Sequence, residues 1–163
     1  MPQLVRVGVI SDTHIPKAAL DLPEAVYAEL KKVDMILHAG DLIEKAFLEK
    51  LERIAPVHAV FGNMDMHALK ACLPQKEVIK INSFRIGLIH GYGPPTRLIG
   101  AVSKEFTRVD AIVFGHSHVP VNEVIEKRLF FNPGTPTDKV FAAFNSFGVL
   151  EIGDSINGRI IRI

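Results

Sequence analysis

The chain has 163 residues, of which 48% are hydrophobic and 23% are charged, a balance typical of a folded globular domain and unlike that of a disordered chain. Lys and Arg number 19 against 18 Asp and Glu, so there is no strong basic field that would signal binding to nucleic acid. The length fits one domain, and no linker or repeat interrupts it, so we expect a single domain over residues 1–163. The apolar runs are strand-length and the start lacks a signal-peptide layout, so we expect a cytoplasmic protein without a membrane segment.

In chain order, the first half alternates strands with helices. Residues 4–10 form a run rich in β-branched side chains, and residues 24–32 follow with helical spacing. The pair recurs as a strand over 35–38 and a helix over 42–54, whose apolar residues return every three or four positions. A third strand is predicted over 57–61.

The second half is dominated by strands. Residues 78–81 and 85–89 flank Asn82-Ser83, which predicts a hairpin with a two-residue turn. A helix over 96–106 and a buried strand over 111–114 follow, and short strands continue after Val119. This order of elements predicts an α/β sandwich with a mixed sheet and helices on the outside.

The one cysteine, Cys72, can form no intramolecular disulfide. Its neighbours Leu69, Ala71 and Leu73 resemble the apolar side of a short helix. We therefore expect a buried, inert thiol that takes no part in chemistry.

Side chains able to bind a metal ion directly follow five of the predicted strands. They are Asp12, His14, Asp41, Asn63, His90, His116 and His118. In α/β sheets, ligands bind beyond the carboxyl ends of the strands, so we expect these residues to meet at one rim. Imidazole nitrogens with carboxylate and amide oxygens suit divalent manganese, iron, cobalt, nickel or zinc, and the lack of thiolates excludes a structural zinc site of the cysteine type.

The simpler alternative for each of these residues is structural. Taken singly, an Asp or His at a strand end more often caps a helix or is solvated. Seven such residues at five strand ends need a common cause, and one metal site supplies it. Glycines stand beside them at Gly40, Gly62, Gly91 and Gly115, as expected where the backbone turns tightly or lets a bulky group approach.

These motifs resemble, in order and spacing, those of the calcineurin-like metallophosphoesterase superfamily. They are Asp12-x-His14, Gly40-Asp41, Gly62-Asn63-x-Asp65, His90-Gly91 and Gly115-His116-Ser117-His118. Chain length and the Gly-Asn-x-Asp form resemble the small prokaryotic phosphodiesterase subgroup, and the resemblance extends to Asn132-Pro133-Gly134. It implies a four-layer αββα sandwich of two mixed β-sheets flanked by helices.

The resemblance also implies two divalent metal ions, with manganese expected first and nickel, iron, cobalt or zinc as alternatives. Asp12, His14 and His118 would hold one ion, and Asn63, His90 and His116 the other. Asp41 would bridge the ions with one oxygen for each, because a carboxylate has two. Asp41, Asn63 and His90 are expected to be catalytic as well as to bind metal.

The implied activity is that of a dimetal-dependent phosphoesterase, foremost a phosphodiesterase. Two dications, less the charges of Asp12, Asp41 and a bridging hydroxide, leave the site net positive, so it should attract an anionic phosphate ester. We expect this hydroxide to attack phosphorus in line. Many superfamily members have a His after the Gly-Asn pair, proposed as the acid for the leaving group, but Met64 stands there in this chain.

Several other polar residues each have two possible roles. Asp65 and His67 are candidates for the missing acid, although loop structure for Asp65 and a surface position for His67 are simpler. His38 either orients a ligand or is a core histidine, His58 is assigned to structure, and Arg97 either contacts phosphate or is a solvated charge.

The expected partner is a small-molecule phosphodiester or other phosphate ester, and a homo-oligomer is left open. Two alternative functions fit the same fold. One is a catalytically weak scaffold, since the retromer subunit of eukaryotes resembles this fold but lacks a full metal set. The other is a module that binds a nucleotide without cleaving it.

Overall fold

The computed structural model describes residues 1–163 and arranges ten strands in two mixed sheets. The first sheet has the order β10-β9-β1-β2-β3. Its strands are β1 (Val5–Ile10), β2 (Met35–His38), β3 (Val57–Ala59), β9 (Ser146–Ile152) and β10 (Ile156–Arg162). The second sheet has the order β4-β5-β6-β8-β7. Its strands are β4 (Lys76–Ile81), β5 (Phe84–Ile89), β6 (Ala111–Val113), β7 (Val121–Ile125) and β8 (Arg128–Asn132).

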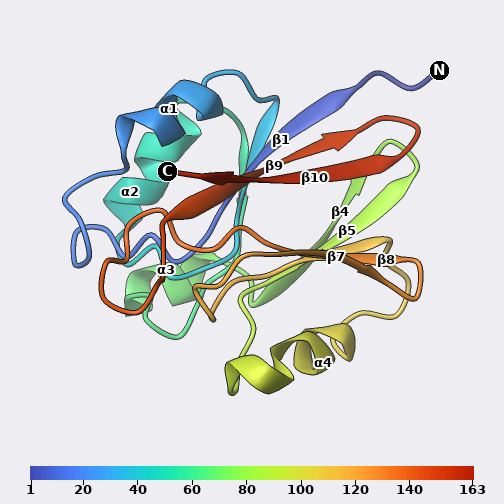
Figure 1. The fold of residues 1–163 in the computed structure, drawn as a ribbon. Helices are drawn as coiled ribbons and strands as arrows, with labels where there is room; N and C mark the ends of the chain where they lie inside the picture. The colour runs from blue at the N-terminus through green and yellow to red at the C-terminus, as the bar shows by residue number, and fades with distance from the viewer.

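Helices cover the outer face of each sheet (Figure 1). The first sheet packs against α1 (Glu24–Leu30), α2 (Lys45–Glu52) and α3 (His67–Cys72). The second packs against a 3-10 turn, η1 (Pro95–Arg97), and α4 (Leu98–Ser103). This succession of helix, sheet, sheet and helix confirms the predicted four-layer sandwich. None of the helices has the length and apolar character needed to cross a membrane.

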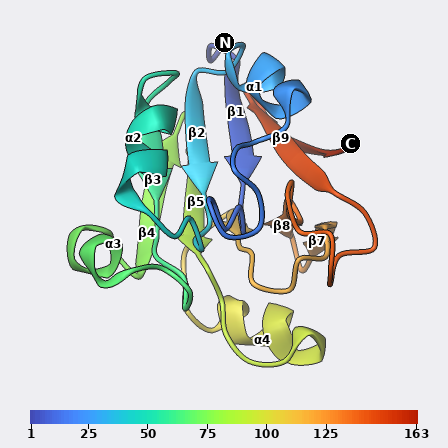
Figure 2. The same cartoon turned by 90° about the vertical axis from the view of Figure 1, so that its left-hand side faces the viewer.

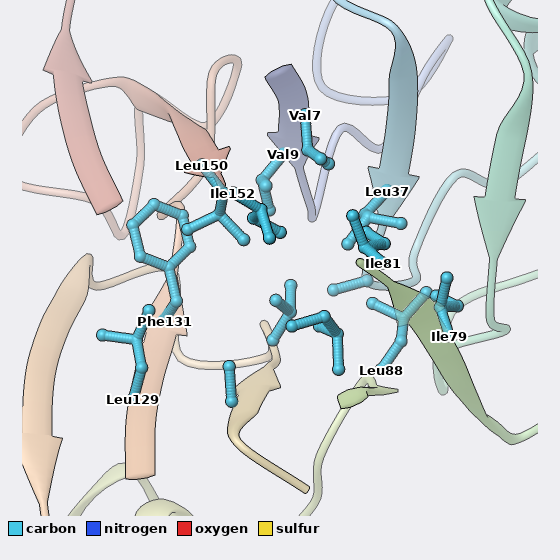
Figure 3. Packing of buried hydrophobic residues seen from close by; sticks show 14 of the residues in the cluster. Val7, Val9, Leu37, Ile79, Ile81, Leu88, Leu129, Phe131, Leu150 and Ile152 are labelled. Carbon is cyan, nitrogen blue, oxygen red and sulfur yellow. The ribbon is translucent and has the colours of Figure 1, made fainter. Parts of the chain in front are cut away.

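The main core lies between the two sheets (Figure 3). It contains 15 buried residues, among them Val7 and Val9 of β1, which face Leu88 of β5 and Phe131 of β8. Ile10 packs on the helix side instead, because successive side chains of a strand point to opposite faces. Burying one such side chain contributes about 1.5–3 kcal/mol, so this layer holds the two sheets face to face.

Parallel strands bring several loops to one end of the molecule. The strands β1, β2 and β3 run parallel, as do β5, β6 and β8. Figure 2 shows the arrowheads of β1 and β2 at the same end. The loops that leave these ends carry all the predicted metal ligands, and the two sheets face each other closely enough for the loops to meet.

The predicted helix over 42–54 is shorter in the structure, where α2 begins at Lys45. Ile43 has a φ of +90°, and its backbone N–H donates to Asp65 Oδ1 at 2.7 Å. Ile43 also pairs with Ile15 in an isolated parallel bridge. Its hydrogen bond to Asp65 and its bridge to Ile15 therefore hold Ile43 outside the helix, and α2 starts later than predicted.

Two further expectations need adjustment. The helix over 96–106 consists of η1 followed by α4, which ends at Ser103. Cys72 is exposed, so the predicted buried thiol is wrong. The helix α3 has only six residues and buries only Leu69, and Cys72 lies at its last position, at the protein surface.

Candidate metal centre

The seven predicted ligands lie together at the rim of the two sheets, in two groups. In the first group, Asp12 Oδ1 lies 3.3 Å from His118 Nε2 and 3.8 Å from His14 Nε2. In the second, Asn63 Oδ1 lies 3.1 Å from His90 Nε2, and the rings of His90 and His116 are 5.2 Å apart. The two groups adjoin each other, because Asp12 Oδ1 also lies 3.9 Å from His90 Nε2.

Asp41 stands between the groups. Its Oδ2 lies 3.5 Å from His14 Nε2 in the first group and 3.4 Å from His90 Nε2 in the second. Its Oδ1 accepts a hydrogen bond from the Met64 backbone N–H at 2.8 Å. Oδ2 is thus the oxygen that faces both groups, while Oδ1 is engaged by Met64.

Hydrogen bonds fix which nitrogen of each ring is free to bind a cation. His90 donates from Nδ1 to Ala39 O at 2.7 Å, and His118 donates from Nδ1 to Asp138 Oδ2 at 2.6 Å. His116 donates from Nε2 to Gly93 O at 3.0 Å. In the neutral rings, Nε2 of His90 and His118 and Nδ1 of His116 therefore keep a lone pair.

Two buried polar atoms of this cluster have no hydrogen-bond partner, namely Asp12 Oδ1 and His14 Nε2. A buried carboxylate oxygen without a partner is costly unless a cation or a donor compensates for the lost water. Carboxylate, imidazole and amide donors without thiolates suit borderline divalent cations. The residues present therefore fit a pair of such cations, one for each group.

The electrostatics of the cluster are strongly coupled. Burial alone would raise the pKa of Asp12, but the His90, His118 and His14 rings hold this pKa well below its usual range. Burial opposes the charged form of His90, yet the Asp12 and Asp41 carboxylates raise its pKa to about 9. The pKa of His118 is also raised to about 9, against burial, by Asp12 and Asp138. Protons and metal ions consequently compete for the same ring nitrogens.

The ligand loops have an unusual backbone. Positive φ angles are adopted by Asp12 (+54°), His14 (+46°), Asp41 (+60°), His116 (+71°) and His118 (+61°). Few non-glycine residues adopt such angles, although Asp and His do so more readily than most, and each costs about 1–3 kcal/mol. Strained residues persist where the surroundings fix them, and here they gather at the candidate site.

Two glycines allow the close approach of the carboxylates. A Cβ added to Gly62 would collide with the Oδ1 atom of Asp41, and one added to Gly115 would collide with the side chains of Ser11 and Asp12. The motif glycines at these positions therefore leave room for ligands from neighbouring loops.

Comparison with known proteins agrees with this geometry. Residues 5–155 match the family model of the calcineurin-like phosphoesterase superfamily domain. The chain belongs to this superfamily. A probable metallophosphoesterase of Methanothermobacter thermautotrophicus is 41% identical over 160 residues, which cover 96% of this chain and 91% of that protein. Family membership confirms the predicted resemblance and makes the chain a relative of metal-dependent phosphoester hydrolases.

Solved structures of the superfamily fold are also similar. Zn²⁺-bound Vps29 of Entamoeba histolytica is 28% identical, with a TM-score of 0.74 over 96% of this chain and 98% of that chain. The structure of an archaeal phosphodiesterase has a TM-score of 0.77 over 97% of this chain and 99% of that chain. Its 20% identity shows a common fold alone.

Asp65 of the phosphoesterase motif organises two ligand loops. Its Oδ2 accepts hydrogen bonds from the backbone N–H groups of Asp41 at 3.0 Å and Gly62 at 2.7 Å, and its Oδ1 accepts one from Ile43. The side chain is 5% exposed. These contacts favour loop structure over direct proton transfer, because both oxygens are turned to the backbone.

His38 supports the loops on the other side of Asp41. It is fully buried, and its Nδ1 accepts a hydrogen bond from the Gly40 N–H at 3.1 Å. Its Nε2 then carries the proton and donates to Thr13 Oγ1 at 3.0 Å. Burial lowers the pKa of His38 to about 3. The residue is therefore a neutral core histidine that also joins the loops bearing Asp12 and Asp41.

The last residue of β8 and the loop after it make contacts with the ligand loops that the sequence did not reveal. Asn132 Nδ2 donates to Gly115 O at 3.0 Å, and Thr135 Oγ1 donates to Asp12 O at 2.8 Å. Asp138 accepts the hydrogen bond from His118 described above. The Asn-Pro-Gly motif was the only signal for this loop, and nothing in the pattern marked Asp138.

The remaining candidates lie apart from the ligand cluster or at its edge. Met64 is 45% exposed and borders the cavity above the cluster. His67 is exposed at the start of α3, and Arg97 is exposed in η1. His58 Nδ1 lies 2.9 Å from Glu77 Oε1, a contact between β3 and β4 that joins the two sheets. His58 therefore has the structural role that we predicted.

Proposed function

We propose that this chain is a dimetal-dependent phosphodiesterase acting on a small phosphate diester. The observation that supports this most strongly is the position of Asp41 Oδ2, 3.5 Å from His14 Nε2 and 3.4 Å from His90 Nε2. A single carboxylate oxygen between two groups of donors suits a shared bridging ligand. Family membership supports the same chemistry.

In this proposal, Asp12, His14 and His118 would hold one cation, and Asn63, His90 and His116 would hold the other, with Asp41 shared. When bound, the cation pair supplies hydroxide near neutral pH and stabilises the phosphoryl oxygens during in-line attack. The two aspartates supply the only negative charges among these ligands, while Asn63 and the histidines add donors without charge. Manganese is our first candidate for the metal, and zinc is a second, given the Zn²⁺-bound Vps29 relative.

The protein residues also restrict the substrate. Met64 cannot protonate a leaving group, and its backbone N–H is used to hold Asp41. Both oxygens of Asp65 accept backbone hydrogen bonds, so this residue is not placed to protonate the leaving group either. The site therefore favours esters whose leaving group departs without a proton from the enzyme.

Two cavities flank Asn63 and support a diester over a monoester. One, of about 430 Å³, extends from Asn63 past His14 and His118. The other, of about 190 Å³, extends past His90 to Gln75 and Tyr92. A phosphorus atom held between them could place one ester group in each cavity, whereas a monoester would leave one cavity empty.

The test compares hydrolysis of bis-p-nitrophenyl phosphate and p-nitrophenyl phosphate by protein that has been chelated and then given manganese, nickel, zinc or magnesium. We expect metal-dependent turnover that is faster for the diester. Asp41→Ala should bind fewer metal ions and reduce hydrolysis to background, while Asp154→Ala, an exposed aspartate far from the cluster in sequence, serves as the matched control. Normal turnover by Asp41→Ala with full metal content would refute the proposal.

A scaffold function is the second candidate, and the likeness to Vps29 favours it. The complete set of metal donors favours an enzyme instead. A scaffold function would be favoured if the protein bound each of the four metals fully but hydrolysed no diester or monoester.

A further inference from the structure

The cavity beside the metal ligands has an apolar wall that the proposed metal chemistry does not use. Its lining includes the candidate ligands His14, Asp41, Asn63, His116 and His118. The rest of the lining consists of the charged residues Lys17 and Asp138 and of four apolar residues, Ala18, Met64, Val140 and Phe141, which form the apolar wall. Its volume of about 430 Å³ falls in the range typical of small-molecule sites, about 300–1,000 Å³.

The large members of this wall are exposed to water in the protein alone. Val140 is 80% exposed, Phe141 is 85% exposed and Met64 is 45% exposed. Scattered exposed apolar residues are common on protein surfaces. These three, however, line the same cavity as the metal ligands, so a ligand bound there would cover them.

Hydrogen bonds tie the apolar wall to the metal ligands. The backbone N–H groups of Val140 and Phe141 donate to Asp138 Oδ1 at 2.8 and 3.1 Å. The other oxygen of Asp138 accepts the hydrogen bond from His118 Nδ1 at 2.6 Å. One carboxylate therefore sets the position of the wall relative to the atom that would bind the cation.

We propose that Ala18, Met64, Val140 and Phe141 receive an aromatic ester group of the substrate, so that the enzyme selects aromatic phosphodiesters. This inference rests on the proposed function, because it places the phosphate at the metal ligands of the same cavity. An aromatic ring is a better occupant than an alkyl chain, since it can stack on Phe141 and contact the Met64 sulfur. Lys17 adds a positive charge to the lining of the same cavity, which suits the anionic phosphate.

The binding test uses two monoanionic phosphonate esters, methyl phenylphosphonate and methyl methylphosphonate. In these compounds a C–P bond, which a phosphoesterase does not hydrolyse, joins the phenyl or methyl group to phosphorus. Calorimetry on the metal-loaded protein should give about five- to tenfold tighter binding of the phenyl compound. Phe141→Ala should reduce this ratio to about two or less. Val124→Ala removes a similarly exposed apolar side chain on β7, outside the cavity, and should leave the ratio unchanged.

The kinetic test compares methyl, phenyl and thymidine 5′ esters of p-nitrophenyl phosphate, which share one leaving group. A higher kcat/KM for the phenyl and thymidine esters supports the inference, and their relative rates distinguish a simple aryl group from a nucleobase. Equal kcat/KM for all three esters overturns the inference but leaves the phosphodiesterase intact, whereas no hydrolysis of any ester overturns the proposed function.

Two results obtained with the variants, without any hydrolysis assay, would also overturn the inference. One is an unchanged phenyl-to-methyl ratio in both Phe141→Ala and Val140→Ala. The other is a change of oligomeric state in Phe141→Ala on sedimentation, which would make the wall an interface between copies of this chain. Both variants change exposed side chains, and equal melting temperatures would show that they fold.

Discussion

Replacing Asp65 should show how strongly one carboxylate holds the site together. Its three backbone hydrogen bonds fix the loops that carry Asp41 and Asn63. In Asp65→Asn, the amide oxygen can still accept from Asp41 and Gly62, but the amide NH₂ then faces the Ile43 N–H. The change removes one charge-assisted hydrogen bond and weakens two, and hydrogen bonds to charged groups contribute about 1.5–3 kcal/mol each. We expect a loss of about 2–4 kcal/mol in the free energy of unfolding.

For a protein of this size, such a loss lowers the melting temperature by about 4–16 °C. Calorimetry in the presence of a chelator measures this without a contribution from metal binding, and Asp154→Asn provides the control. Titration with manganese should also show weaker binding by Asp65→Asn, because Asp41 loses its backbone support. A melting temperature and a manganese affinity both equal to those of the unmodified protein would refute the structural role of Asp65.

Three further results are expected. Asp138→Asn should weaken metal binding about 10- to 100-fold, measured by competition with a chromophoric chelator, because His118 loses a charged hydrogen-bond acceptor. Metal affinity should rise as pH increases from about 7 to 9, since the pKa values of His90 and His118 are raised to about 9 and their protons must leave; calorimetry in two buffers of different ionisation enthalpy should detect this proton release. Met64→His should speed hydrolysis of alkyl esters more than aryl esters, and an unchanged ratio would count against the missing acid.

The gathering of the seven candidate ligands could be predicted because its signal is local. Each donor directly follows an apolar strand, and parallel strands such as β1 and β2 must end at the same edge. The motif spacing matches a known superfamily, which implies the four layers that the structure confirms and the pairing of donors that stays a prediction. The separation of Asp12 from His118 along the chain was no obstacle, because the topology brings their loops together.

Other features depend on contacts that no local pattern records. The late start of α2 follows from the hydrogen bond between Ile43 and Asp65, and the exposure of Cys72 follows from the shortness of α3. The single facing oxygen of Asp41 depends on the Met64 N–H. Asp138 lies in an irregular loop where an aspartate is ordinary, and only its contact with His118 shows its role.

We propose above all that Asp12, Asp41, Asn63 and four histidines hold two cations in one site. Anomalous diffraction from a crystal loaded with manganese tests it directly. We expect two peaks about 3.5–4 Å apart, one near His14 and His118 and the other near His90 and His116, with Asp41 Oδ2 in contact with both. A single peak, or peaks away from these residues, would contradict it.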